Sequence, residues 1–387
     1  MTKKWVNIAD VLFFQEGPGV RNTQYTTSGV KLLNVANLVD GKVDLSKSDR
    51  YISEEEAYGK YRHFLCDDGD FVIASSGIKV EYIDKKMGFV DASMLPLCMN
   101  TSTIRFKVLD ENQLRIRYFM YYLKSKHFKE QLTKQITGSA QLNYGPSHLK
   151  KMIMPLIDIT VQDEIISCMD KLQSIIETRQ RELIELDRLM KARFVEMFGD
   201  PIQNPKGWEV VTIGDIVTEV RYGTSKPAVE GGKYPYLRMN NLTADGHLDL
   251  NDLKYIDIPD DEIEKCVVRK GDVLFNRTNS IELVGKTAVF DLPEDMIIAG
   301  YIIRVRLTEK MLPEVLSQYM NLEALKGILR GMAKGAVNQA NINAQELQSI
   351  KVYIPEMELQ KQFVKMKEQI YKSLRKESKV VQTKKQY

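Results

Sequence analysis

The sequence predicts a mixed α/β (α+β) chain made of two tandem modules and two long antiparallel coiled-coil helices, in a pseudo-twofold arrangement. Three observations support this fold class: a long helical stretch near the middle, a repeated sequence pattern on either side of it, and a second helical stripe at the C-terminus. The predicted modules cover residues 1–157 and 201–355. The predicted helices cover residues 158–200 and 356–387.

The central helix is predicted from Thr160 to Phe198, because no Gly or Pro occurs before the stop signal Gly199-Asp200-Pro201. Apolar residues recur there at every seventh position among many charged ones, which favours a coiled-coil helix over a helix buried in a core. At 1.5 Å per residue its length is roughly 55–60 Å, which suits a spacer between two modules. The stripe consists of Met169, Ile176, Leu183, Met190 and Met197.

A coiled-coil helix needs a partner, and the C-terminal residues provide a second helical stripe. We therefore expect the two helices to pack against each other in antiparallel directions. The second stripe consists of Leu359, Phe363, Met366, Ile370 and Leu374.

The two modules repeat the same order of sequence features. Each begins with lysine shortly before a tryptophan, as Lys3-Lys4-Trp5 in the first copy and Lys206-Gly207-Trp208 in the second. The segment LLNVANLVDGKVDL in the first copy matches YLRMNNLTADGHLDL in the second, and each predicts short strands joined by turns. Next, DGDFVI in the first copy matches KGDVLF in the second, as a turn that leads into a buried strand.

The second part of each copy follows the same order. A helical stretch, YFMYYLKSKHFKEQLTKQI or LSQYMNLEALKGILRGMA, is followed by a glycine and a polar run. A strand then ends at Pro155 or Pro355, and Gln162 or Gln360 opens the following helix. Two such copies would present equivalent loops to a partner with its own rough symmetry, and duplex DNA is one such partner.

Composition excludes several classes of protein. The net charge is only +3, so a surface for nucleic acid must be local. No apolar run is long enough for a membrane span or a signal peptide, so we expect a cytoplasmic protein with no membrane partner. The four cysteines are far apart and the chain has only four histidines, which leaves no zinc-site spacing and predicts no metal site. The cysteines are Cys66, Cys98, Cys168 and Cys266.

Catalytic motifs are missing from the sequence. It contains no GxxxxGK[ST], GxGxxG, HExxH or GxSxG pattern, and Asn204-Pro205-Lys206 is not the Asn-Pro-Pro-aromatic run of amino-methyltransferases. The sequence therefore predicts a non-catalytic protein with no cofactor of its own.

Polar, glycine-flanked loops are the candidate binding elements of the second copy. Arg can pair with guanine through two hydrogen bonds, and Asn or Gln can pair with adenine. The alternative for any single loop is that its Asn and Ser side chains only form turns. The candidates in the second copy are Arg221, Tyr222, Thr224, Ser225, Lys226, Asn276, Arg277, Thr278, Asn279, Lys286, Asn338, Gln339 and Asn341.

The first copy offers candidates at positions that we take as equivalent, with 19–24 matched to 221–226. Lysines in both copies, Lys31, Lys79, Lys226 and Lys286, are candidate phosphate contacts, which would set register and salt dependence. The candidates in the first copy are Arg21, Asn22, Gln24, Ser75, Ser76, Gln141, Asn143 and Tyr144.

Taken together, these residues resemble the DNA-specificity subunits of type I restriction-modification systems. The resemblance covers nearly the whole chain. It is carried by the Trp208 entry, YLRMNNL, the Gly271-Asp272 turn into LFNRTNS, Gly285-Lys286-Thr287, the Asn338-Gln339 run, the strand end at Pro355 and the EMFGDP close of the central helix.

The resemblance implies two target-recognition domains, each of which binds one half of a split double-stranded DNA site, with the two helices as a spacer. It implies as partners two modification (methyltransferase) subunits and restriction subunits. S-adenosylmethionine, ATP and Mg would belong to those partners. The alternative from a different class is a coiled-coil scaffold that binds protein partners only.

Overall fold

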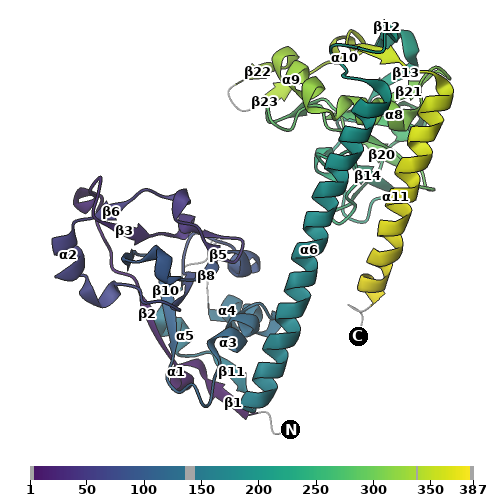
Figure 1. Cartoon of the computed structure of the whole chain (residues 1–387). Coiled ribbons are helices and arrows are strands. Elements are labelled where there is room, and N and C mark those ends of the chain that lie inside the picture. Colours follow the sequence, from purple (N-terminus) through teal and green to yellow (C-terminus); the bar gives the residue numbers. More distant parts are fainter. Residues whose placement is uncertain (1–3, 136–143, 337–338, 384–387) are drawn as a thin grey trace. The chain divides into compact units, whose positions relative to one another are not determined.

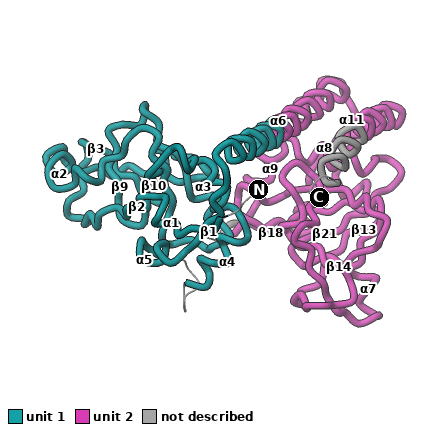
Figure 2. The backbone as a smooth tube through the Cα atoms, turned by 90° about the horizontal axis from the view of Figure 1, so that it is seen from below, with its two compact units in different colours: residues 1–178 teal, residues 179–387 magenta. Residues whose placement is uncertain are grey.

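A computed structural model describes residues 4–135, 144–336 and 339–383. The chain divides into two compact units, unit 1 (Met1–Thr178) and unit 2 (Arg179–Tyr387), drawn in different colours in Figure 2. The long helix α6 (Ile159–Phe198) crosses the boundary between them.

Unit 1 carries the first module. Its strands are β1 (Lys4–Asn7), β2 (Leu12–Glu16), β3 (Val30–Leu33), β4 (Leu38–Val39), β5 (Lys42–Val43), β6 (Tyr51–Ile52), β7 (Phe71–Ala74), β8 (Met87–Phe89), β9 (Leu97–Met99), β10 (Thr103–Val108) and β11 (Ile153–Leu156). Its helices before α6 are α1 (Ile8–Val11), α2 (Glu54–Tyr58), α3 (Ile116–Leu123), α4 (Lys126–Gln135) and α5 (Pro146–Leu149).

Unit 2 carries the second module. Its strands are β12 (Glu209–Thr212), β13 (Val217–Tyr222), β14 (Tyr234–Leu237), β15 (Lys254–Ile256), β16 (Val267–Val268), β17 (Val273–Asn276), β18 (Thr278–Asn279), β19 (Thr287–Val289), β20 (Met296–Ile298), β21 (Ile302–Leu307), β22 (Lys334–Ala336), β23 (Gln339–Asn341) and β24 (Lys351–Ile354). Its helices after α6 are α7 (Asp260–Cys266), α8 (Pro313–Met320), α9 (Glu323–Met332), α10 (Ala344–Gln348) and α11 (Met357–Thr383).

Both modules share the strand order of their main antiparallel sheet and two further strand pairings. An antiparallel sheet has the order β2-β10-β7-β8 in unit 1 and β13-β21-β17-β19 in unit 2. A second sheet contains a parallel pair, β3 with β9 or β14 with β20. The first strand of each module pairs with the last, β1 with β11 and β12 with β24. The mixed fold and the tandem repeat predicted from sequence are therefore confirmed.

The core of unit 1 explains why its strands and helices form where they do. β7 has the sequence FVIA and is buried along its whole length, which suits a strand covered on both faces. The Phe106 and Phe119 rings lie 5.0 Å apart, so α3 packs against the sheet. The helical stretch predicted from 118 to 136 is broken after Leu123, and α4 follows as a separate helix.

Matched hydrogen bonds show the repeat at the level of single side chains. Asn37 accepts a hydrogen bond from the backbone N–H of Asn34 at 3.0 Å and donates to the carbonyl of Asp44 at 3.0 Å. Asn241 makes the same two contacts in unit 2, each at 2.8 Å. Both asparagines are buried, so the repeated Asn-Leu dipeptide marks a scaffold turn.

A buried glutamine fixes the start of the long helix in each half. Gln360 accepts from the N–H of Leu312 at 2.9 Å and donates to the carbonyls of Lys310 at 3.1 Å and Pro355 at 2.8 Å. Gln162 makes the equivalent three hydrogen bonds at 2.9, 2.8 and 2.9 Å. Each glutamine therefore ties its helix to the module that precedes it.

Replacing Gln360 with alanine is expected to destabilise unit 2 by about 2–4 kcal/mol, because three backbone groups that are buried or partly buried lose their partner. Urea unfolding followed by Trp208 fluorescence measures this, in a Trp5→Phe background that leaves one tryptophan. Gln362→Ala is the matched control, because Gln362 is exposed two residues further along the same helix. Equal midpoints for the two variants would contradict the assigned role of Gln360.

Each module also buries an arginine. In unit 1, the Arg105 guanidinium donates to the Asp70 carboxylate at 3.2 Å, and Lys107 approaches the same carboxylate at 3.3 Å. In unit 2, the fully buried Arg304 donates to Glu219 at 2.9 Å. Because a buried charge is costly without a partner, these ion pairs are part of the scaffold.

The central helix forms as predicted, and its two ends pack on different units. Near its start, Arg115 and Arg117 of unit 1 form ion pairs with Asp163 and Asp170, at 2.8 and 2.7 Å. The apolar residues of its C-terminal end, Met190, Phe194 and Phe198, are buried in the core of unit 2.

Helix α11 runs back from the end of α6 in the opposite direction (Figure 1). The Phe363 ring lies 5.3 Å from the ring of Phe194 and 5.5 Å from that of Phe198. Within the described side chains, the α11 stripe contacts the unit 2 core and the end of α6. Further back along α6, the apolar residues of the predicted stripe stay exposed, namely Met169, Ile176 and Leu183.

Candidate nucleic-acid interface

Three predicted loops of the second module meet at one surface of unit 2. β18, which contains Thr278 and Asn279, pairs antiparallel with β23, so that Thr278 lies opposite Asn341. The end of β13 joins them, because the Arg277 guanidinium lies over the Tyr222 ring at 4.9 Å. Segments far apart in sequence therefore form one polar surface.

Tyr222 is held firmly on this surface. It is the last residue of β13 and lies opposite Ile303 of β21. Its hydroxyl accepts a hydrogen bond from the N–H of Ala344 at 2.8 Å, and 43% of its surface is exposed. The ring is thus a fixed, solvent-facing platform.

Buried amides position the strands of this surface. Asn276 is fully buried and donates to the carbonyls of Thr278 at 3.2 Å and Tyr301 at 3.1 Å. It also accepts a hydrogen bond from the Asn279 side chain at 2.8 Å, and the Thr278 hydroxyl donates to Asn341 at 3.1 Å. Asn276 and Thr278 therefore support the surface. The groups that could bind a ligand there are the side chains of Arg277 and Gln339 and the NH₂ group of Asn341.

The segment after β13 is also fixed. The Lys226 ammonium forms an ion pair with Glu262 of α7 at 2.9 Å, and the Arg221 guanidinium contacts Glu219 at 3.1 Å. Thr224 accepts from the N–H of Lys226 at 3.2 Å, while Ser225 is exposed. Lys226 and Arg221 thus reach the surface with their charge already balanced by a carboxylate.

Lys286 does not fit the predicted role of a phosphate contact. Its side chain is buried, and its ammonium donates to the carbonyls of Met239 at 2.8 Å and Leu242 at 2.5 Å. Burial lowers the pKa of this lysine. Lys86 occupies the equivalent place in unit 1, where its ammonium lies 3.5 Å from the carbonyl of Val35. Lys286 is therefore a scaffold residue, and this part of the prediction is corrected.

The first module carries different side chains at the equivalent positions. From the strand pairing, Glu16 in unit 1 is the equivalent of Tyr222 in unit 2, and Ser75 is the equivalent of Arg277. Ser75 is buried and donates to Glu16 at 3.1 Å. Tyr144 is also buried, and its hydroxyl donates to the carbonyl of Ala74 at 2.8 Å. Ser75 and Tyr144 are thus removed from solvent, which speaks against the predicted DNA contacts there, whereas Ser76 is half-buried.

The predicted match of segments 19–24 and 221–226 is wrong in register. The N–H of Gly17 bonds to the carbonyl of Thr103, as that of Gly223 bonds to Ile302. A β-carbon on either glycine would lie 2.1 Å from a backbone carbonyl oxygen. Gly17 is therefore the equivalent of Gly223, and 19–24 begin two residues after that point.

The loop itself still lies at the surface of unit 1. Arg21 and Asn22 are exposed, and Gln24 donates to Glu56 at 2.6 Å and to the Tyr61 hydroxyl at 3.1 Å. Among the phosphate candidates, Lys79 is exposed and Lys31 forms an ion pair with Asp49 at 3.0 Å. The predicted contacts at Gln141, Asn143 and Asn338 lie outside the described residues.

The sequence analysis missed Tyr301. Its side chain is 49% exposed, and its carbonyl accepts hydrogen bonds from the N–H of Arg277 at 2.9 Å and from Asn276. The only signal was a large aromatic residue directly after Gly300, at the entry to the buried strand β21. This position becomes informative only when β17 and β21 are known to pair.

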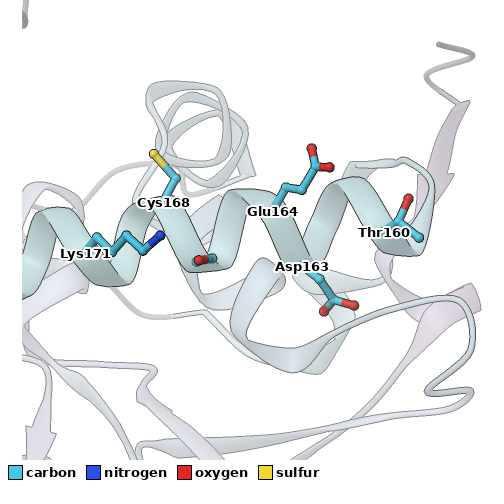
Figure 3. A pocket seen from close by; sticks show the side chains of 6 residues that line it. Thr160, Asp163, Glu164, Cys168 and Lys171 are labelled. Carbon is cyan, nitrogen blue, oxygen red and sulfur yellow. The ribbon is translucent and has the colours of Figure 1, made fainter.

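A hollow of about 570 Å³ lies along the start of α6 (Figure 3). All the residues that line it come from this one helix, so it is a helix surface and not a cleft between elements. Among the described residues, no group of three His, Cys, Asp or Glu side chains is placed to hold a metal ion. None of the helices in the described ranges combines the length and apolar character needed to cross a membrane.

Comparison with known proteins gives matches in both halves. The family model described as "Type I restriction modification DNA specificity domain" matches residues 18–188 and 205–382. The EcoKI specificity subunit of Escherichia coli (strain K12) is 22% identical over 66% of this chain and 58% of its own length. A putative MjaX specificity subunit of Methanocaldococcus jannaschii is 32% identical over 42% of this chain and 39% of its own length. The matches thus span about half the length of these relatives.

Two solved structures are also similar to the chain. A chain from a study of complex assembly and conformational transition of the type I R-M system has a TM-score of 0.49 at 18% identity, covering 98% of this chain and 92% of that one. The S subunit from M. genitalium has a TM-score of 0.48 at 15% identity, covering 97% and 92%. Because the family model matches each of the two modules, the protein belongs to the family of type I restriction-modification DNA specificity domains.

Proposed function

We propose that this chain is the DNA-specificity subunit of a type I restriction-modification complex and recognises a bipartite DNA target. Its family is a non-catalytic DNA-recognition component of such complexes. The observation that carries the proposal is the surface of unit 2, where three separate segments bring Tyr222, Arg277 and Asn341 together. Arg and Asn side chains recognise base edges in the major groove.

Each module would recognise one half of the target. The repeat of topology supports two equivalent readers, and the change from Tyr222 and Arg277 to Glu16 and Ser75 supports different half-sites. In this mechanism the modules occupy adjacent major grooves, about 34 Å apart from centre to centre, with the helices as the spacer. Contacts to phosphates set the register, and the exposed loops discriminate between bases.

The partners would be two modification subunits and the restriction subunits. The support in this chain is the row of apolar side chains exposed on the middle of α6, which a protein partner could cover. S-adenosylmethionine would be bound by the modification subunits, and ATP and Mg by the partners as well. The chain itself would supply recognition and a docking helix. The exposed apolar residues are Met169, Leu172, Ile175, Ile176, Leu183, Ile184 and Leu189.

Exchange of the second module tests the proposal. Residues 207–355 are replaced by those of another family member that recognises a known, different target. We expect one half of the recognised sequence to change to that of the donor and the other half to stay, because each module carries its own loops. Methylation mapping in cells that carry the complete system, and selection of duplexes from a random pool, both measure this.

A reciprocal exchange of residues 1–157 is the control and should change the other half only. A recognised sequence that survives both exchanges would defeat the proposal. A scaffold that binds only proteins gives a different result, with no sequence preference for DNA. For the specific complex we also expect the affinity to fall steeply as salt rises.

A further inference from the structure

Arg277 differs from every other arginine of the second module. Within the described residues it forms no ion pair, and its guanidinium makes a single long hydrogen bond to a protein oxygen there, from Nη1 to the carbonyl of Gly300 at 3.4 Å. Its Nε is buried and, like that of Arg238 and Arg304, has no hydrogen-bond partner in the part of the chain that the structure describes. The other arginines between residues 201 and 355 all pair with carboxylates, namely Arg221, Arg238, Arg269, Arg304, Arg306 and Arg330.

The backbone of Arg277 is fixed on both sides. Its N–H donates to the carbonyl of Tyr301 at 2.9 Å, and its carbonyl accepts from the N–H of Ile342 at 2.9 Å. The residue follows the buried strand β17 directly, and Asn276 beside it is fully buried. The side chain therefore leaves the scaffold from a defined point.

The guanidinium is also held at a defined place. It lies 4.9 Å from the centre of the Tyr222 ring, and that ring is anchored by the hydrogen bond from Ala344. Stacking on an aromatic face restricts a planar guanidinium and leaves its N–H edge free for a ligand. A stacked arginine loses less conformational freedom on binding than one that is free in solvent.

We propose that Arg277 recognises a guanine in the half-site of the second module, with Tyr222 as the positioning residue. Two parallel N–H groups of arginine match the N7 and O6 acceptors of guanine in the major groove, and no other base offers this pair. This inference deepens the proposed function and rests on it.

A phosphate is the other ligand with suitable acceptors, and the surface favours guanine over it. A phosphate accepts hydrogen bonds from many directions and requires charge more than orientation, so a flexible lysine serves it well. Here the guanidinium lies over an anchored aromatic ring, and the neighbouring side chains are the amides of Asn279, Asn341 and Gln339. The arrangement thus suits a base edge.

The test uses the full chain and random duplex DNA. Wild type should select a bipartite sequence in which one guanine of the half-site set by residues 207–355 is invariant. Arg277→Ala should lose the preference at that one position and keep all others, with affinity for the wild-type sequence reduced about ten- to a hundredfold. Arg277→Lys should show most of this loss, because it keeps the charge but not the paired N–H groups.

Arg269→Ala is the matched control and should leave the selected sequence unchanged, because Arg269 is already paired with Glu264 and Asp295. A second test changes the DNA. 7-Deazaguanine, which lacks the N7 acceptor, replaces the guanine that Arg277 is proposed to recognise. Wild type should lose affinity for this duplex, whereas Arg277→Ala should bind it as well as it binds guanine.

The outcomes distinguish failure of the proposed function from failure of the guanine assignment. If wild type selects no sequence at all, the proposed function fails together with this inference. If it selects a bipartite sequence that Arg277→Ala leaves unchanged, only the role of Arg277 is overturned. A uniform loss of affinity on all duplexes, restored by Arg277→Lys, would identify a phosphate contact and would also overturn the guanine assignment.

Discussion

Replacing Phe363 with alanine is expected to destabilise unit 2 by about 3–5 kcal/mol, because a large aromatic ring leaves a packed core and a cavity remains. Phe363 is fully buried and contacts the rings of Phe194 and Phe198. Its ring is the fully buried member of the α11 stripe and contacts the end of α6 within the core of unit 2. Urea unfolding followed by Trp208 fluorescence, in the Trp5→Phe background, measures the change.

Phe363→Leu keeps most of the apolar volume and should cost clearly less than Phe363→Ala. The fluorescence of Trp5, followed in a Trp208→Phe background, reports unit 1 and should show an unchanged transition. A loss of stability in unit 2 below 1 kcal/mol for the alanine variant would mean that α11 docks without this ring.

Asp70→Asn is expected to cost unit 1 about 3–5 kcal/mol, because a buried arginine then loses its charged partner. The Asp70 side chain is 2% exposed and faces Arg105 and Lys107. It also accepts a hydrogen bond from the N–H of Asp67 at 2.9 Å. Urea unfolding of the Trp208→Phe chain, followed by Trp5 fluorescence and circular dichroism, measures the loss.

Asp68→Asn is the matched control. Asp68 is exposed in the same turn, and the substitution is again an aspartate to an asparagine. It should alter the stability by less than about 0.5 kcal/mol, as surface substitutions usually do. Equal effects of the two substitutions would show that the ion pair of Arg105 does not stabilise unit 1.

The repeat and the long helix could be predicted because they depend on local patterns. The seven-residue spacing and the Gly199-Asp200-Pro201 stop define the central helix without any tertiary information. The matched Asn-Leu dipeptides and the glutamines at 162 and 360 occur at equivalent points of both copies because each makes backbone contacts that the fold requires.

The details of the candidate site depend on contacts between segments that are distant in sequence. The local sequence pattern does not indicate these contacts. Lys286 lies in a polar Gly-Lys-Thr run that is typical of a surface loop, yet its long side chain carries the ammonium to buried carbonyls. The segments 19–24 and 221–226 are matched by their place between similar scaffold residues, and only the strand hydrogen bonds align Gly17 with Gly223. The pairing of Tyr222 with Arg277 spans segments that are far apart in sequence.

In each module the first strand pairs with the last, and this pairing favours exchange of whole modules by genetic recombination. Lys4 lies opposite Leu156, and Glu209 lies opposite Ile354, so the chain enters and leaves each module at the same edge. A genetic crossover at these two points exchanges a complete folded body and leaves the adjoining helices intact. Under the proposed function, such recombination would give a new combination of half-sites in one step, without the stability losses that accompany a gradual redesign of a core.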